Sequence, residues 1–336
     1  MSSIFIVNHM DKTLIKEDNE EKNKEELYNI TKYIQDNKIK DKIKIKITST
    51  GEVREIEVNE YLKGVLPAEM PPEYDIEALK AQAVVARTYL YQKMGTNAHD
   101  DADICDNYAH CQAYYNTEQI LKIWERSKGW NLEERERHLK KVSTAVEETN
   151  NIVVTYKGKY IKAYFHACSG GKTENVSNIW GKQKIAYLVS VESLGEENYK
   201  NYTSKVKLNI SELQTKLNKD ATMKCSIQNT GGDIVEILNY TDTGRVDKVK
   251  IGGIIYTAEK LRTLLGLRST NFKVEYDEGN VIFNVTGNGH GVGMSQVGAN
   301  YYALEGYSYD QIITHYYTGV DVTYIYREDE TNENKI

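Results

Sequence analysis

Residues 59–91 read NEYLKGVLPAEMPPEYDIEALKAQAVVARTYLY, and this stretch decides the fold of the chain. It contains all three prolines of the sequence, at positions 67, 71 and 72, and each fixes its own φ angle and restricts the residue before it. Asn59 is the predicted N-cap of a short helix ending at Leu66, and Asp75 that of a second helix ending near Met94. The second helix is apolar or small on nearly every face, which predicts that it is buried. Glu69 therefore lies in the stiffest part of the sequence, directly before a buried helix.

Alternating apolar and polar residues on both sides of this stretch predict β-hairpins. We expect hairpins at residues 42–58, 151–167 and 272–285, short helices at 258–266, about 295–305 and 308–316, and a final strand at 320–326. The order of these elements predicts an α+β fold with a β-hairpin-rich core, and not alternating βαβ units.

A helical arm is predicted within this β-rich chain, at about residues 116–149. It consists of two polar helices around Gly129, and Asn131 and Glu134 have the spacing of a capping box for the second. We expect a single domain over residues 41–328 that includes this arm. A charged tether over residues 1–40 precedes the domain, and a short tail over residues 329–336 follows it.

The composition of the 336-residue chain excludes several classes of protein. The formal net charge of −6 argues against a nucleic-acid partner, and four cysteines are too few for a disulfide scaffold of this length. No window approaches 18 consecutive apolar residues, so no membrane span is expected within the sequence. The apolar run at residues 4–7 is too short for a signal peptide. The protein is therefore either cytoplasmic or carried by an N-terminal anchor outside these residues.

Residues 99–114, HDDADICDNYAHCQAY, concentrate the reactive side chains of the chain. His99, Cys105, His110 and Cys111 are the right ligand types for tetrahedral zinc, although their spacing is not that of a common zinc finger. A Cys105–Cys111 disulfide and free thiols are the two alternatives. A zinc ion with four protein ligands has no open position, which indicates a structural site and not a catalytic one.

Two polar loops follow strands farther along the chain. The first, FHACSGGKTENVSNIWG, covers residues 165–181, and the second, GNGHGVGMSQ, covers residues 287–296 and gives a polymer close access to the backbone. Cys168 paired with a histidine at 166, 290 or 315 would make a cysteine hydrolase, but a small half-buried cysteine is the simpler interpretation. A catalytic serine at Ser169 is not supported, because the G-x-S-x-G motif is absent.

Glu69 is the carboxylate that the sequence singles out, because a general acid must be held in place and kept partly protonated. Lys80 and Arg87 interrupt the helix that follows it. They are seven residues apart, so they share one helix face about 10 Å along the axis. Their side chains either face solvent or lie near Glu69.

Four stretches taken together resemble the stage II sporulation protein D family, which includes the amidase-enhancer domain. They are NEYLKGVLPAEMPPEYDIEALKAQAVVARTYLY, CDNYAHCQAYY, AYFHACSGGKTENVSNIWG with YLVSVES, and GNGHGVGMSQVGANYYALEGYSYDQIITHYYTGV. The resemblance runs from about residue 43 to 327. It implies a peptidoglycan lytic transglycosylase that acts during engulfment of the forespore. A glutamate of such an enzyme protonates the glycosidic oxygen between N-acetylmuramic acid and N-acetylglucosamine. It then takes the proton of the C6 hydroxyl, leaving a 1,6-anhydro end.

The resemblance also assigns residues. The family glutamate of the P-A-E-M-P motif corresponds to Glu69, and its basic companions correspond to Lys80 and Arg87, which we expect to face a glycan-binding cleft. Substrate contacts or loop shaping are implied for His166, Ser169, Gly170, Gly171, Tyr187, His290 and Gln296. The cysteines of the C-x5-C stretch occur in only part of the family, which favours a structural zinc, and no organic cofactor is expected.

The same resemblance suggests partners and location. The expected partners are peptidoglycan glycan strands freed of stem peptides, a peptidoglycan amidase, and membrane scaffold proteins of the engulfment machinery. The expected location is extracytoplasmic, on an N-terminal membrane anchor that would precede the tether. The alternative function is a non-catalytic cell-wall-binding activator of an N-acetylmuramoyl-L-alanine amidase. A third hypothesis is a zinc amidase or peptidase built on the Cys/His stretch.

Overall fold

The computed structural model describes residues 42–94, 96, 99–181, 184–220, 224–227 and 234–325, and these form the α+β fold that the sequence predicts. The helices are α2 Val58–Glu69, α3 Ile76–Met94, α4 Thr117–Lys128, α5 Leu132–Glu148, α6 Val176–Ile179, η1 Glu196–Asn198, α7 Ile210–Leu217, α8 Ala258–Leu265, α9 Gln296–Leu304 and α10 Tyr309–Tyr316. The strands are β1 Lys42–Lys46, β2 Val53–Glu57, β3 Ile104–Cys105, β4 Ile152–Tyr156, β5 Lys159–Tyr160, β6 Phe165–His166, β7 Thr203–Asn209, β8 Val235–Tyr240, β9 Val246–Ile251, β10 Ile254–Thr257, β11 Phe272–Asp277, β12 Asn280–Thr286, β13 Met294–Ser295 and β14 Asp321–Tyr324. The tether, the predicted anchor and the tail at 329–336 lie outside the described residues.

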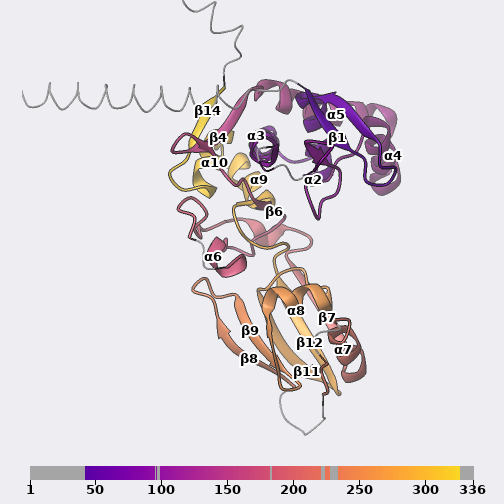
Figure 1. Ribbon diagram of the computed structural model, residues 1–336, viewed down its shortest axis with the longest axis vertical. Coiled ribbons are helices and arrows are strands. Elements are labelled where there is room, and N and C mark those ends of the chain that lie inside the picture. Colours follow the sequence, from indigo (N-terminus) through magenta and orange to yellow (C-terminus); the bar gives the residue numbers. More distant parts are fainter. Residues whose placement is uncertain are drawn as a thin grey trace, which may run out of the picture.

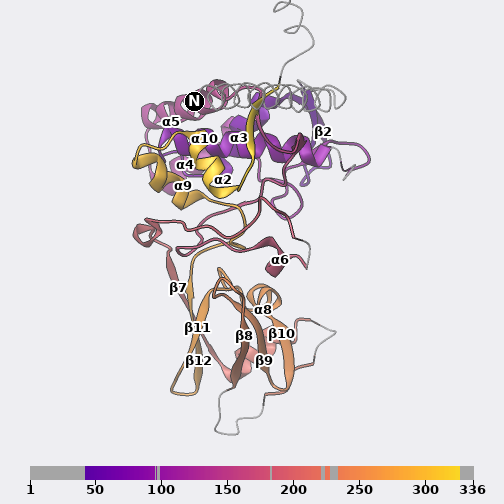
Figure 2. The ribbon, with the colours of Figure 1, turned by 90° about the vertical axis from the view of Figure 1, so that its left-hand side faces the viewer.

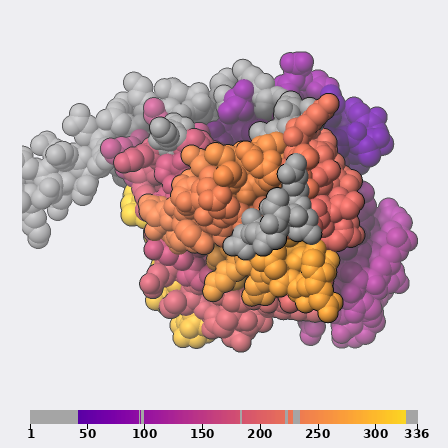
Figure 3. Space-filling model, turned by 90° about the horizontal axis from the view of Figure 1, so that it is seen from below, coloured from indigo at the N-terminus to yellow at the C-terminus, as the bar shows by residue number. Residues whose placement is uncertain are grey.

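The described residues contain two separate hydrophobic cores. The first gathers around α3, with α2, α5, α9, α10 and the sheets β2-β1-β3 and β14-β4-β5 packed about it. The second lies in a smaller lobe made of the sheets β10-β9-β8 and β11-β12-β7 with α7 and α8. Figures 1 and 2 show this lobe beneath the helical one in two perpendicular views. Seen from below, its orange surface fills the centre of the molecule (Figure 3). The sequence prediction of a single domain over 41–328 does not anticipate these two lobes.

Residues 59–91 form parts of two helices, α2 and α3, and α2 differs from its prediction. Glu57 and not Asn59 is the N-cap of α2, and the helix continues through Pro67 to Glu69. Pro67 lacks the N–H of one backbone hydrogen bond, and the helix ends two residues after it. The N–H of Met70 closes the last turn by donating to Leu66 O at 2.9 Å. The start of α3 is as predicted, because the Asp75 carboxylate accepts the N–H of Glu77 at 2.9 Å.

The local signals of the predicted arm are confirmed, and the structure adds where its second helix packs. Gly129 ends α4 in the left-handed region at φ +68°, and the Asn131–Glu134 capping box starts α5. However, α5 packs on α3 and α2, and it buries Val142, Ala145 and Val146 in the first core. These residues follow the spacing of one helix face, so α5 carries an apolar stripe that must be covered. The arm is part of the core.

Antiparallel pairs form within each of the three predicted hairpins. Strand β1 pairs with β2, β4 with β5, and β11 with β12. A further pair, β9 with β10, is not among the predicted hairpins. Lys157 and Gly158 both have positive φ angles, which suits the two-residue turn between β4 and β5. Most of the hairpin pairing lies in the second lobe, whereas the core that surrounds α3 is mainly helical.

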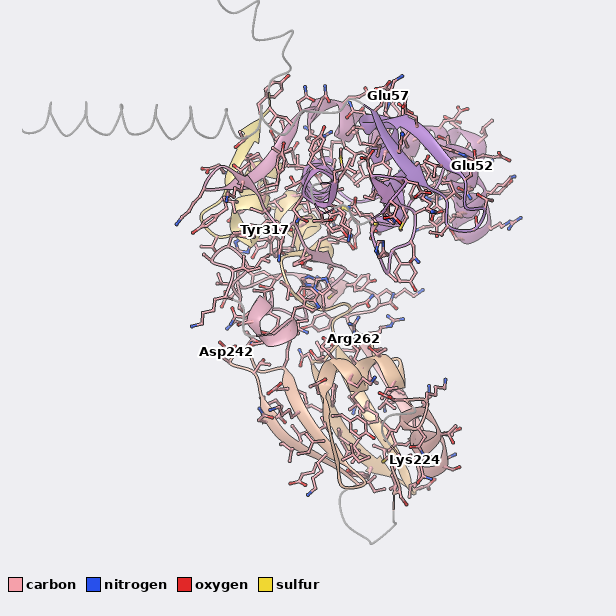
Figure 4. The ribbon with its side chains drawn as sticks, viewed as in Figure 1. Glu52, Glu57, Lys224, Asp242, Arg262 and Tyr317 are labelled. Atoms are coloured by element: carbon pink, nitrogen blue, oxygen red, sulfur yellow. The ribbon has the colours of Figure 1, made fainter. Side chains whose placement is uncertain are left out.

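The loops between the lobes carry β6 and α6 (Figure 1), and β13 pairs with β6. Arg245, just before β9, is buried and donates to the carbonyls of Ser169 at 2.5 Å and Lys172 at 3.3 Å. Asp242, at the end of the second lobe that faces α6 (Figure 4), accepts hydrogen bonds from the side chains of Asn175 and Asn178. These contacts fix the second lobe against the loop that the sequence associates with substrate.

Candidate active site and Cys/His cluster

Glu69 is the last residue of α2, and its carboxylate is half-buried. Its Oε1 atom accepts the backbone N–H of Ala113 at 3.0 Å. Burial raises the pKa of the Glu69 carboxyl, and the bond from Ala113 lowers it by less. The negative end of the α2 dipole acts in the same direction as burial, because it disfavours a carboxylate at a helix C-terminus. The site therefore favours a glutamate that holds its proton to a higher pH than usual, as a general acid requires.

The segment that provides the Ala113 amide lies along α2. Tyr61 donates to the Gln112 side chain at 3.2 Å and stacks on Tyr114 with ring centroids 5.6 Å apart. Gly64 permits this close approach, because a Cβ at that position would lie 2.4 Å from the Tyr114 ring. The segment after the Cys/His stretch is thus fixed against the helix that carries Glu69.

The Cys/His stretch brings four predicted ligand atoms together. The ligand atoms of His99, Cys105, His110 and Cys111 all lie within 4.8 Å of one another. The Nε2 atom of His99 is 3.4 Å from Cys111 Sγ, and the Nδ1 atom of His110 is 3.5 Å from Cys105 Sγ and 3.3 Å from Cys111 Sγ. Zinc bonds of about 2.3 Å to sulfur and about 2.1 Å to nitrogen place tetrahedral S and N ligands about 3.6 Å apart. The donor set and its spacing fit a zinc ion.

All four cysteines of the chain are described and none of them forms a disulfide, so the alternative of a Cys105–Cys111 disulfide is wrong for this structure. Cys105 lies in β3, which pairs in parallel with β1. The Asp103 carboxylate accepts the N–H of Lys44 at 2.8 Å, and the Asp106 carboxylate accepts the N–H of Thr48 at 2.9 Å. The cluster is therefore attached to β1 on one side and leads directly to the Glu69 contact on the other.

Arg87 does not lie in a cleft beside Glu69, contrary to the expectation from the resemblance. Its side chain is fully buried, and its guanidinium donates to the carbonyls of Val146, Thr149 and Ile152 at 2.6–3.2 Å. These carbonyls belong to the end of α5 and the residues after it, where the helix dipole is negative and favours a cation. Burial lowers the pKa of Arg87 to about 10, so it remains charged at neutral pH. Its position makes it a structural cation.

Lys80 is partly exposed and forms two ion pairs, with Glu77 and Glu148, both at 2.8 Å. It joins α3 to the end of α5. Among the described residues, neither Lys80 nor Arg87 forms a hydrogen bond or an ion pair with Glu69. Their catalytic roles stay predictions.

Residues 169–171, which we call the SGG loop, surround a carboxylate of the protein itself. Glu196, in η1, is fully buried and accepts the backbone N–H groups of Ser169, Gly170 and Gly171 at 2.6–3.1 Å. It also accepts the hydroxyls of Ser169 and Ser193, both at 2.8 Å, the hydroxyl of Ser295, and the Cys168 thiol. The buried Ser169 side chain bonds to Glu196, which fits loop shaping, the second of its two expected roles. Glycan contact by Gly170 and Gly171 remains a prediction.

The other predicted substrate residues fall into separate places. His166 and His290 lie together, with ring centroids 5.6 Å apart. Gln296 is buried and donates to Gln82 on α3 at 3.3 Å. Tyr187 packs on Tyr156, and its hydroxyl accepts the N–H of Lys162 at 3.0 Å. Within this set, His290 is the residue whose ring also contacts Trp180.

The hypothesis of a catalytic Cys168 is not supported by its surroundings. The side chain is 1% exposed, and burial together with the charge of Glu196 raises the pKa of its thiol to about 12. A nucleophilic cysteine requires a depressed pKa and access to substrate.

Sequence analysis missed Ala113, Glu196, Arg245 and Trp180. The two adjacent glycines of this loop were the available sequence signal, because glycine readily adopts a positive φ. In the structure φ is +82° at Gly170 and +99° at Gly171, which lets successive N–H groups converge on an anion. No local pattern indicated that the anion would be Glu196. Ala113 contributes a backbone atom, so its side chain carried no signal. Trp180 forms ring contacts with Tyr164 and His290 that appear only in the fold.

None of the described helices is both long and apolar enough to span a bilayer.

Several known proteins are similar to this chain. The family model described as "Stage II sporulation protein" matches residues 46–156. The stage II sporulation protein D of Bacillus amyloliquefaciens is 36% identical over 280 residues, covering 82% of this chain and 77% of that protein. The corresponding Bacillus subtilis protein is 32% identical with the same coverage. The amidase enhancer of Bacillus subtilis is 28% identical, and the matched region covers 78% of this chain and 40% of the amidase enhancer. With this fold and these relatives, the chain belongs to the stage II sporulation protein D family.

Proposed function

We propose that the protein is a peptidoglycan lytic transglycosylase with Glu69 as its single acid and base. The observation that carries the proposal is the half-buried Glu69 carboxyl, with its raised pKa and its bond from the Ala113 N–H. Protonated Glu69 donates to the oxygen between C1 of N-acetylmuramic acid and C4 of N-acetylglucosamine. The C1–O bond breaks, and the Ala113 N–H stabilises the carboxylate that forms. Glu69 then removes the proton of the C6 hydroxyl as that oxygen bonds to C1.

This reaction uses one carboxylate, because the sugar supplies its own nucleophile. The proton given to the leaving oxygen is recovered from the C6 hydroxyl, so the protons balance. A hydrolase would need a second carboxylate to act on water or on C1. Among the described residues Glu69 accepts one hydrogen bond, from Ala113, and this supports the single-residue scheme. A carboxyl with so few donors can change its protonation state twice in a cycle.

The test is digestion of amidase-treated glycan strands, with the products read by mass. The wild type should yield 1,6-anhydro-muramic ends, and Glu69→Gln should lower the rate by at least about 100-fold. Glu60→Gln is the matched control, since Glu60 is exposed on the same helix. Reducing ends would mean hydrolysis, and unchanged cleavage by Glu69→Gln would overturn the assignment of Glu69.

We propose that His99, Cys105, His110 and Cys111 hold one zinc ion with a structural role. With four protein ligands, the ion would supply folding stability and would leave no position for water. Cys105→Ser or a chelator should then lower the thermal midpoint, whereas Cys225→Ser, in the second lobe, should leave metal content unchanged. Loss of activity on chelation with no change in the thermal midpoint would favour the zinc amidase or peptidase instead.

A non-catalytic role is the second candidate, because one relative is named an amidase enhancer. Under this hypothesis the protein binds wall glycan and stimulates a separate amidase. This hypothesis is favoured if Glu69→Gln and the wild type stimulate a purified amidase equally and neither of them cleaves glycan strands.

For both candidate functions we propose extracytoplasmic glycan strands freed of stem peptides as the partner. An amidase and the membrane scaffold proteins of engulfment are the proposed protein partners, and an N-terminal membrane anchor is the proposed attachment.

A further inference from the structure

Trp180 is a large aromatic residue that the fold leaves open to solvent. It follows the short helix α6 as its C-cap, and its N–H donates to Val176 O at 3.0 Å. Its side chain is 47% exposed, although tryptophan is highly buried on average. The exposed part of the indole is available to a ligand.

Neighbouring rings hold the indole in place. Tyr164 and His290 contact it, with ring centroids at 4.7 and 4.9 Å and interplanar angles of 51° and 57°. His290 is itself fixed, because its Nδ1 accepts the N–H of Val292 at 3.1 Å. Rings that are already immobilised lose little conformational freedom when a ligand stacks on them.

The two histidines beside these rings are uncharged, and the charges of Arg245 and Arg262 help to keep them so. Burial lowers the pKa of His166 to about 3 and lowers the pKa of His290 well below its usual value, so both rings are neutral at neutral pH. His166 Nδ1 lies 3.2 Å from Val292 O and must donate to it, which leaves Nε2 as an acceptor. Nε2 has no partner among the described residues. Aromatic faces with neutral polar groups suit an uncharged sugar better than a charged ligand.

The rings belong to the lobe that carries the candidate acid. Tyr164 packs against the first core, and Leu66 of α2 is buried in that core. Glu69 ends the same helix, so the rings and Glu69 lie on one lobe.

We infer that Trp180, supported by Tyr164 and His290, is a stacking subsite for a sugar ring of the glycan strand, away from the bond that is cut. This inference rests on the proposed function, since it assumes that a glycan lies along Glu69. The subsite contributes to the binding of long strands and does not take part in the chemical step.

The test measures binding of amidase-treated glycan strands to the full chain carrying Glu69→Gln, so that the strands stay intact. Adding Trp180→Ala should weaken binding of long strands by about ten-fold and leave binding of short fragments nearly unchanged. Trp180→Phe should stay within about three-fold of the parent. Tyr240→Ala, an exposed aromatic residue on the second lobe, is the control and should bind as the parent does.

Two readouts separate this subsite from a merely structural role and from the proposed function. Long strands should change the tryptophan fluorescence of the Glu69→Gln protein, and Trp180→Phe should abolish that change. In the active protein, Trp180→Ala should raise KM for long strands with kcat unchanged. Equal binding by Trp180→Ala and the parent, or equal losses in Trp180→Ala and Trp180→Phe, would overturn the subsite. Neither result would affect the assignment of Glu69, which depends on the anhydro products.

Discussion

Two glutamates of this molecule lie in opposite surroundings. Glu196 is fully buried and is held by backbone N–H groups, serine hydroxyls and a thiol. Glu69 is half-buried, and in the described part of the chain it accepts one hydrogen bond, from Ala113. A buried carboxylate with many donors is held in one position and organises the loops around it. A carboxylate with few donors and partial burial can gain and lose a proton. The number of donors distinguishes a carboxylate that holds structure from one suited to chemistry.

The strongest test of this contrast is Glu196→Ala. The substitution leaves buried N–H and hydroxyl groups from three loops without a partner, which should lower the free energy of unfolding by about 4 kcal/mol. Denaturant titration measures the change. Glu197→Ala is the matched control, because Glu197 is exposed and should give a change near zero. A small loss of stability in Glu196→Ala would mean that water replaces the carboxylate. The two glutamates would then not differ in what they contribute to the free energy of unfolding.

Arg87 extends the contrast to a buried cation. Arg87→Met keeps much of the volume but removes the guanidinium bonds to the carbonyls of Val146, Thr149 and Ile152, so it should lower the free energy of unfolding by about 3 kcal/mol. Arg126→Met, at an exposed position of α4, should have little effect. The fraction of Arg87→Met that remains folded should show the wild-type pH profile of glycan cleavage. A shifted profile would instead indicate that Arg87 acts on Glu69.

The pH dependence of cleavage tests the proton on Glu69. A general acid with a raised pKa works up to that pKa, and above it the rate should fall about ten-fold per pH unit. Ala113→Pro removes the N–H that favours the carboxylate, so the alkaline limb should move to higher pH. Ala113→Gly keeps the N–H and should leave the limb in place. If the alkaline limb of Ala113→Pro lies at the same pH as that of the wild type, the limb does not report the ionisation of Glu69.

The smallest expected effect is on the stability of Glu69→Gln. The pKa of Glu69 is raised in the folded state, so stability present below the unfolded pKa is lost as pH rises through the folded value. The glutamine amide of the variant cannot ionise, and its oxygen can still accept the Ala113 N–H. At pH 7 the variant should therefore be as stable as the wild type or more stable, by less than about 1 kcal/mol. The difference should vanish near the unfolded pKa of a glutamate, about 4.3. A clear loss of stability at pH 7 would place Glu69 with Glu196 as a structural group.

Local chemistry alone determined a large part of the fold. The Asp75 cap, the left-handed Gly129, the Asn131–Glu134 capping box and the Lys157–Gly158 turn all depend on a few adjacent residues. The four ligands of the Cys/His cluster are separated by at most 12 positions, so their types alone indicated a common site. The three prolines clustered around Glu69 distinguish it from the other carboxylates by sequence alone, because they restrict the backbone on both sides of it.

Only the tertiary structure decided how distant residues meet. Ala113 is 44 positions from Glu69, Ser169 is 27 from Glu196, and Arg87 is 62 from Thr149. The division into two lobes and the burial of α5 against α3 were equally outside the reach of local patterns. Sequence periodicity tells which face of an element is apolar, but not which other element covers it. Contacts between distant segments depend on the path of the whole chain, because the backbone and side-chain groups that become partners are chosen by packing.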